Sequence, residues 1–176
     1  DQDDALYAAL DHATKMAAVE VVYARSLYAG SAHASGPLSG EVLAVLSAEE
    51  PESIARGVSA VRDALAELFA FEAVGDGGVT LFAASIGRVG RYLAAQAGVP
   101  EGSSLGYLIA PPVEALVGLD AALKTADVRL VRFFGPPTET NFAGGYVTGP
   151  LDAVEAAARA FAAAVEAVAS DPRRGG

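Results

Sequence analysis

The sequence predicts an α/β fold in which one unit occurs twice in tandem, and two observations support this prediction. First, residues 10–22 and 119–131 align at a shift of 109, with seven of thirteen positions identical. Second, in each copy apolar residues at helical spacing are followed by alternating apolar residues, mostly β-branched, which is the pattern of a helix leading into a strand. The two copies should therefore share one local structure.

The first copy is expected to contain two helices, two strands and one long loop. A helix over 10–17 leads into a strand over 19–22, and a second strand and helix follow at 41–46 and 52–69. The two strands are separated by residues 29–40, which are rich in Gly and Ser. Hairpin connections usually take about two to five residues, so this loop is long enough to have a function of its own.

The second copy repeats this order and adds three elements in front of it. The added elements follow a glycine-rich turn at 75–78 and are a strand at 79–82, a helix at about 85–97 and a strand at 105–110. The repeated elements are a helix at 119–126, a strand at 128–131, a loop at 135–145, a strand at 146–148 and a helix at 151–169. The expected division is a first domain over 1–74 that lacks its opening strands, a second domain over 75–170, and a flexible tail over 171–176.

Composition excludes several classes of protein. The chain of 176 residues has 12 Lys and Arg against 22 Asp and Glu, a net charge of −10, and no basic patch that would bind nucleic acid. Every apolar run is shorter than the roughly 18 residues that a membrane span needs. The acidic first residues have no basic or apolar region of a secretion signal, so the cytoplasm is the expected location.

The sequence also gives no sign of catalysis, of a cofactor or of a metal. There is no cysteine and there are only two histidines, which leaves little for a transition-metal site. The GRVG segment at 87–90 does not make a dinucleotide fingerprint, and phosphate-loop and nucleophile-elbow motifs are absent. No closely spaced pair of acids is expected in an ordered pocket, so we predict that the protein is not an enzyme.

Three long segments carry a resemblance to a known family. LGYLIAPPVEALVGLDAALKTADVRLV resembles the core of bacterial microcompartment shell domains, known as BMC domains. ATKMAAVEVVYARSLYAGSAHASGPLSGEVL and PPTETNFAGGYVTG are similar to shell proteins of the ethanolamine-utilisation type. The resemblance implies two tandem, circularly permuted BMC domains with ferredoxin-like antiparallel sheets and packed helices, the first without its opening strands.

The function implied by this resemblance is structural. Tandem-domain shell proteins form homotrimers that imitate hexagons, tile into a layer through lateral contacts with other shell proteins, and carry gated pores for small polar metabolites. The location implied is the shell of a microcompartment in the cytoplasm. The alternative is a regulatory module that senses a small amine, which should stop at a closed oligomer and form no layer.

Lys15 and Lys124 are the only lysines in the chain, and they occupy the same position in the two copies. A lone lysine on a helix is commonly just a solvated charge. The resemblance implies a different role, in which each lysine lies along the edge of the tile and donates hydrogen bonds to the neighbouring tile.

The two glycine-rich loops are implied by the resemblance to surround the threefold axis of the trimer and to form a central gate. The alternative is that they are ordinary surface loops. His33 is more simply explained as a polar loop residue than as a metal ligand. The residues assigned to the gate are His33, Ser35, Gly36, Pro37, Thr138, Glu139 and Asn141.

A smaller pore within each subunit is also implied, with a lining of acidic and aromatic side chains. The residues that align with this lining are Asp3, Asp4, Glu41, Phe71 and Thr140. Carboxylates beside an aromatic face suit a small ammonium ion such as protonated ethanolamine. The alternative for Asp4, which is expected just before the first helix, is a role as a helix cap.

Overall fold

The structure is a computed structural model that describes residues 3–27, 41–75, 78–136 and 142–171. The first part of the chain contains α1 (Asp3–Met16), β1 (Glu20–Leu27), β2 (Glu41–Ser47) and α2 (Pro51–Glu67). The second part contains β3 (Glu72–Val74), β4 (Val79–Ile86), α3 (Arg91–Ala97), β5 (Leu105–Ala110), α4 (Pro112–Thr125), β6 (Arg129–Phe134), β7 (Ala143–Thr148) and α5 (Leu151–Ser170).

The predicted repeat is confirmed in structure down to the pairing of its strands. α1 leads into β1 as α4 leads into β6, and each strand then pairs with an antiparallel partner. The register shifts between Val21 and Tyr23 in β1, and between Leu130 and Arg132 in β6. These two irregularities lie at the same repeat position, so the copies share a local bulge as well as a helix and a strand.

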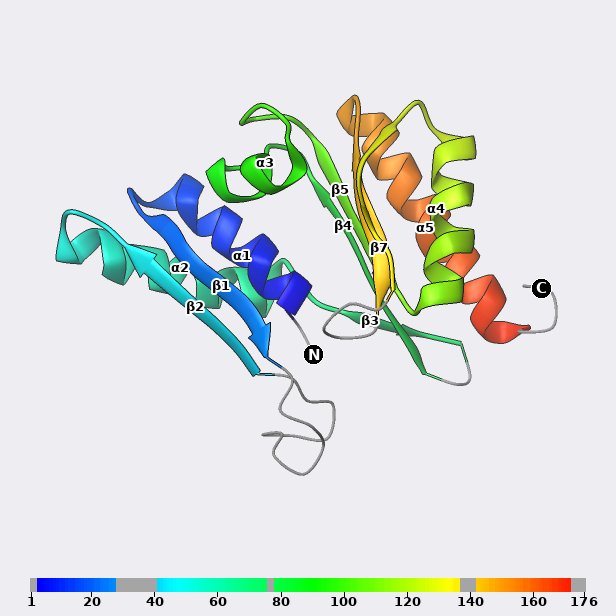
Figure 1. Cartoon of the computed structure of the whole chain (residues 1–176), viewed down its shortest axis with the longest axis horizontal. Helices are drawn as coiled ribbons and strands as arrows, with labels where there is room; N and C mark the ends of the chain where they lie inside the picture. The colour runs from blue at the N-terminus through cyan, green and yellow to red at the C-terminus, as the bar shows by residue number, and fades with distance from the viewer. Residues whose placement is uncertain (1–2, 28–40, 76–77, 137–141, 172–176) are drawn as a thin grey trace.

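The second part folds around a five-stranded antiparallel sheet in the order β3-β4-β5-β7-β6. α4 and α5 cover one face of this sheet, while α3 lies on the other side, toward α1 (Figure 1). Along the central strands, neighbouring side chains point to opposite faces. Leu108 belongs to the core beneath α4 and α5, whereas Tyr107 belongs to the core shared with α1 and α3.

Two glycines allow the close packing of the second part. Gly144 in β7 has a φ of 155°, and a Cβ added there would lie 1.9 Å from the carbonyl oxygen of Leu108 in the next strand. Gly118 in α4 leaves room for the ring of Phe161 in α5, since a Cβ there would come within 2.6 Å of that ring. These positions fix how closely α4, α5 and the central strands approach one another.

The first part is built around the antiparallel pair of β1 and β2, with α1 between this pair and α3 (Figure 1). Among the described residues, β2 pairs only with β1, whereas its counterpart β7 also pairs with β5. The fold agrees with the expected tandem α/β units with antiparallel sheets and packed helices. By residue number β3 falls within the predicted first domain, but it pairs with β4 in the five-stranded sheet of the second part. The domain boundary between residues 74 and 75 stays a prediction.

Three details of the predicted elements were wrong. The helix expected over 85–97 begins only at Arg91, because Ser85 and Ile86 continue β4 and pair with β5. Residues 87–90 contain two glycines and no alanine, so they do not favour a helix, and α3 starts only after Gly90. The short strand β3 was not predicted. Asp3 and Asp4, expected before the first helix, lie in its first turn.

Candidate functional site

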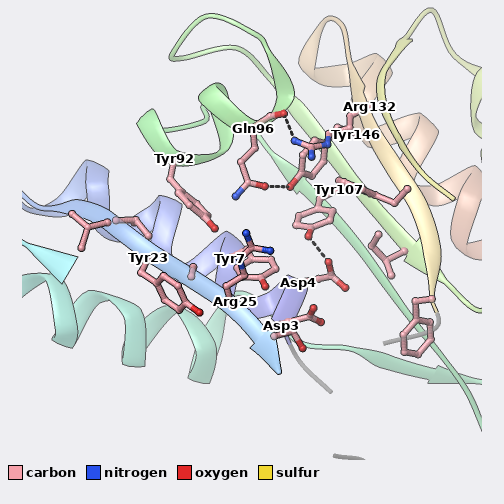
Figure 2. A pocket seen from close by; sticks show the side chains of 17 residues that line it. Asp3, Asp4, Tyr7, Tyr23, Arg25, Tyr92, Gln96, Tyr107, Arg132 and Tyr146 are labelled. Carbon is pink, nitrogen blue, oxygen red and sulfur yellow. Dashed lines mark hydrogen bonds between the residues drawn. The ribbon is translucent and has the colours of Figure 1, made fainter. Parts of the chain in front are cut away.

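A cavity of about 490 Å³ lies where the first part of the chain faces the second sheet. Figure 2 shows that its side chains come from α1, β1, α3 and the strands of the second sheet. The lining residues are Asp3, Asp4, Tyr7, Val21, Val22, Tyr23, Ala24, Arg25, Ser26, Tyr92, Gln96, Tyr107, Ile109, Arg132, Phe134, Phe142 and Tyr146. The cavity therefore exists only because the two parts of the chain are docked.

Hydrogen bonds tie the wall of this cavity together (Figure 2). The Tyr107 hydroxyl donates to Oδ1 of Asp4, which joins the sheet to α1. The Tyr146 hydroxyl donates to Oε1 of Gln96 at 3.2 Å, and Arg132 donates to the Gln96 carbonyl oxygen at 2.8 Å. The rings of Tyr107 and Tyr146 pack edge to face at 4.6 Å. The aromatic wall is thereby held in one arrangement.

The charged side chains that line the cavity are two adjacent acids, Asp3 and Asp4, and two arginines, Arg25 and Arg132. Asp3 and Asp4 are each only 8% exposed. Burial and the charge of Asp3 raise the pKa of Asp4 to about 7, against the opposing effect of the hydrogen bond from Tyr107. Burial also raises the pKa of Tyr107 and of Tyr146, so both phenols are neutral at physiological pH.

This arrangement can hold a small cation next to neutral hydroxyl groups. Carboxylates in a partly enclosed site favour positive charge, and aromatic faces add to that attraction. Arg25 and Arg132 also line the cavity; Nη1 of Arg132 donates to the Gln96 carbonyl, and Cζ of Arg132 lies 5.4 Å from the centre of the Phe134 ring. Asp4, with a pKa near neutral, can exchange its proton for such a cation.

The residues predicted for the small pore are brought together only in part. Asp3 and Asp4 share the cavity, which corrects the expectation that no pair of acids would sit in an ordered pocket. Phe71 lies behind the lining, with its ring 6.0 Å from that of Phe142, which does line the cavity. Glu41 begins β2, but its side chain lies outside the described residues, as does Thr140.

Sequence reasoning missed most of the cavity wall. Tyr7, Tyr92, Tyr107 and Tyr146 come from four separate elements, and no short motif connects them. The available signal was the presence of tyrosines in the otherwise aliphatic strands β5 and β7, because a buried tyrosine usually needs a partner for its hydroxyl group.

The two lysines predicted for the tile edge have different surroundings. Nζ of Lys15 donates to the carbonyl oxygen of Arg88 at 2.9 Å and lies 3.4 Å from Oδ2 of Asp11. Lys124 bonds to Oδ2 of Asp120 at 2.6 Å, and its side chain is 74% exposed against 29% for Lys15. Lys15 thus connects the two parts of the chain, while Lys124 lies on the surface.

Asp11 forms the central contact between the two parts. Its side chain is fully buried and accepts hydrogen bonds from the backbone N–H groups of Gly90 at 2.7 Å and Leu93 at 2.9 Å. Gly90 must stay small, since a Cβ there would lie 2.4 Å from Oγ1 of Thr14. α1 is therefore held against the start of α3 by charge-assisted hydrogen bonds.

The residues assigned to the central gate lie outside the described residues, so the gate stays a prediction. They are His33, Ser35, Gly36, Pro37, Thr138, Glu139 and Asn141. Within the described ranges, no group of three or more His, Cys, Asp or Glu side chains is placed to hold a metal ion. No helix in the same ranges is long and apolar enough to cross a membrane.

Comparison with known proteins places this fold among the tandem-domain shell proteins of bacterial microcompartments. A solved structure of EutL from Leptotrichia buccalis superposes on this chain with a TM-score of 0.90 at 51% sequence identity. The superposed region covers 97% of this chain and 79% of the solved chain. The trimeric shell protein PduB shares the fold, with a TM-score of 0.76 and 21% sequence identity. This match covers 91% of this chain and 70% of the PduB chain. No family model matches the sequence.

The chain belongs to the EutL family of bacterial microcompartment shell proteins. It is 49% identical to EutL of Clostridium perfringens and 45% identical to EutL of Salmonella typhimurium, in each case over 173 residues. The alignments cover 98% of this chain and 80% and 79% of the two relatives. This chain is therefore a structural shell protein of the ethanolamine-utilisation type. These relatives support that prediction and give no support to the alternative of a separate amine sensor.

Proposed function

We propose that the protein forms homotrimers that imitate hexagons and tile, with other shell proteins, into the shell of an ethanolamine-utilisation microcompartment in the cytoplasm. The observation that carries this proposal is the repeat of helix, strand and bulge in one chain, combined with 49% identity to a shell protein. Three copies of a two-unit chain supply the six similar units of a closed ring. In this role the protein needs no catalytic residue, metal or cofactor.

Layer formation tests the proposal, and Lys124→Ala is the variant to use. Native mass by light scattering should show a trimer for the wild type and the variant, while negative-stain microscopy should show sheets for the wild type alone. The reason is that an edge lysine donates hydrogen bonds to the next tile, and every tile carries several equivalent edges. Alanine is preferred to glutamate, which would place a like charge beside Asp120.

Arg159→Ala is the matched control, because Arg159 is also an exposed cation, with Glu155 four residues before it on α5. This variant should form sheets as the wild type does. Sheets of Lys124→Ala that match those of the wild type would contradict the edge role. A wild-type protein that stays monomeric or dimeric and never forms a layer would contradict the proposed function as a whole.

We also propose that the cavity around Asp3 and Asp4, extended by Glu41, Phe71 and Thr140, is a small pore that binds a protonated amine such as ethanolamine. The two buried acids and the aromatic wall support this proposal. The central gate, with the residues assigned to it above, would be a separate opening at the threefold axis for small polar metabolites.

Calorimetric titration with ethanolamine at pH 8 tests the small pore. The variant Asp3→Asn is expected to weaken binding at least tenfold, since it removes one charge from a poorly solvated site. Asp63→Asn, a change of an exposed acid on α2, should leave the affinity unchanged. Ethylene glycol, which lacks the ammonium group, should not bind. Equal affinities of wild type and Asp3→Asn would overturn the proposal.

A further inference from the structure

One tyrosine in the cavity wall bonds directly to an acid of the proposed pore. The hydroxyl group of Tyr107 donates a hydrogen bond to Oδ1 of Asp4, which joins β5 to the first turn of α1 (Figure 2). Both side chains are buried, since Tyr107 is 2% exposed and Asp4 8%. A buried carboxylate that accepts a hydrogen bond from a phenol is held in one orientation.

The ring of Tyr107 is fixed by its aromatic neighbours. Phe82 packs against it edge to face, with the ring centres 5.3 Å apart and the planes at 90°. Tyr146 packs against it with the ring centres 4.6 Å apart and an angle of 75° between the planes. The position of the Tyr107 hydroxyl oxygen is therefore set by the core of the second part, and the acid on α1 meets a donor that is already in place.

Other ionisable groups line the cavity together with Asp4. They are Asp3 and Tyr7 on α1, Arg25 on β1, Tyr92 on α3, Arg132 on β6 and Tyr146 on β7. Burial and the charge of Asp3 raise the pKa of Asp4, whereas the hydrogen bond from Tyr107 lowers it. Removing the Tyr107 hydroxyl group should therefore favour the protonated, neutral form of Asp4.

We propose that Tyr107 is a positioning residue of the small pore, whose hydroxyl group favours the ionised form of Asp4 and holds it in place for a protonated amine. The inference rests on the proposed pore and adds a residue that acts through Asp4. A neutral Asp4 does not attract an ammonium ion, so the amine competes with a proton for this acid. The alternative is that Tyr107 only fills the core, with Asp4 as the acceptor that a buried hydroxyl group needs.

Calorimetric titration of Tyr107→Phe with ethanolamine at pH 7 and at pH 8.5 separates the two roles. The variant keeps the ring and loses only the hydroxyl group. At pH 7 its affinity is expected to be at least about fivefold below that of the wild type, because hydrogen bonds to ionised groups favour the charged form. At pH 8.5 most of this difference should disappear, because Asp4 then ionises in both proteins and aliphatic amines remain protonated.

Tyr146→Phe is the matched control, because it removes the hydroxyl group of the neighbouring buried tyrosine, which donates to Oε1 of Gln96. Any change in the affinity of this control should be equal at the two pH values. A ring-fluorinated tyrosine at position 107 is a second test, in which every hydrogen bond is kept. Fluorine makes the phenol a stronger donor, so this protein should bind ethanolamine more tightly than the wild type at pH 7 and equally at pH 8.5.

The outcomes separate this inference from the pore on which it rests. If Tyr107→Phe binds ethanolamine as the wild type does, or more weakly by one constant factor at both pH values, the role of Tyr107 is refuted and the pore stands. If the fluorinated protein binds like the wild type at pH 7, the inference fails even where Tyr107→Phe does not fold. If the wild type binds no ethanolamine, both the inference and the proposed pore are overturned.

Discussion

Replacing Asp11 by alanine is expected to lower the free energy of unfolding by about 3–5 kcal/mol, because two buried backbone N–H groups lose their acceptor. These groups belong to Gly90 and Leu93, at 2.7 and 2.9 Å from the carboxylate. The substitution also removes the carboxylate beside Lys15. Since these bonds join the two parts of the chain, the loss should also loosen the cavity between them.

Urea denaturation of the 176-residue chain, followed by circular dichroism, measures this loss. Asp11→Asn keeps one acceptor oxygen and should fall between the wild type and Asp11→Ala. Asp63→Ala removes an exposed acid that takes part in a hydrogen bond of 3.4 Å on α2, and it should change the stability by less than about 1 kcal/mol. A stability of Asp11→Ala equal to that of Asp63→Ala would show that the contact between the two parts contributes little.

The sequence predicted the repeat well because local patterns carry it. The apolar spacing of α1 and α4 and the alternation in β1 and β6 depend on neighbours within a few residues, so both copies were found in the right order. The helix expected over 85–97 failed at its start because β4 continues through Ile86 to pair with β5. That pairing partner is about twenty residues away, beyond the reach of a local pattern.

The candidate site was predictable only in its acids. Asp3 and Asp4 were named from the resemblance to a family, while the tyrosines that enclose them come from positions between 7 and 146. Likewise, Asp11 and Asp120 are the same residue in the same motif, and only the docked α3 makes one of them buried. Contacts that depend on how two units meet leave no signature in a single sequence.

The stability of the folded chain is expected to fall as the pH rises from about 4 to about 7, and Asp4→Asn should abolish most of this fall. The pKa of Asp4 is raised from 3.8 to about 7 by burial and by Asp3. In this window the folded state keeps a proton that the unfolded state has released, so raising the pH favours unfolding. Above pH 7 the full penalty is present, on the order of 4 kcal/mol.

The comparison of wild type and Asp4→Asn isolates this effect from other titrating groups. The pKa of His12 is lowered by burial and by Lys15, which gives a pH dependence of the opposite sign, but this contribution is present in both proteins. Thermal or urea unfolding at about pH 3.5, below the unfolded pKa, should give similar stabilities, whereas at pH 8 the variant should be the more stable by several kcal/mol. Parallel pH profiles for the two proteins would refute the raised pKa.

An amine links this pH dependence to the proposed pore. Above pH 7 the ionised carboxylates of Asp3 and Asp4 lie in a largely buried site, and a protonated amine there would replace the lost proton as the compensating charge. Because a ligand that binds only the folded state stabilises it, adding ethanolamine at pH 8 should raise the stability of the wild type and have a much smaller effect on Asp4→Asn. At pH 5, where Asp4 holds its own proton, the wild type should gain less from the same concentration of amine. An equal gain at both pH values would show that the amine does not bind at these acids.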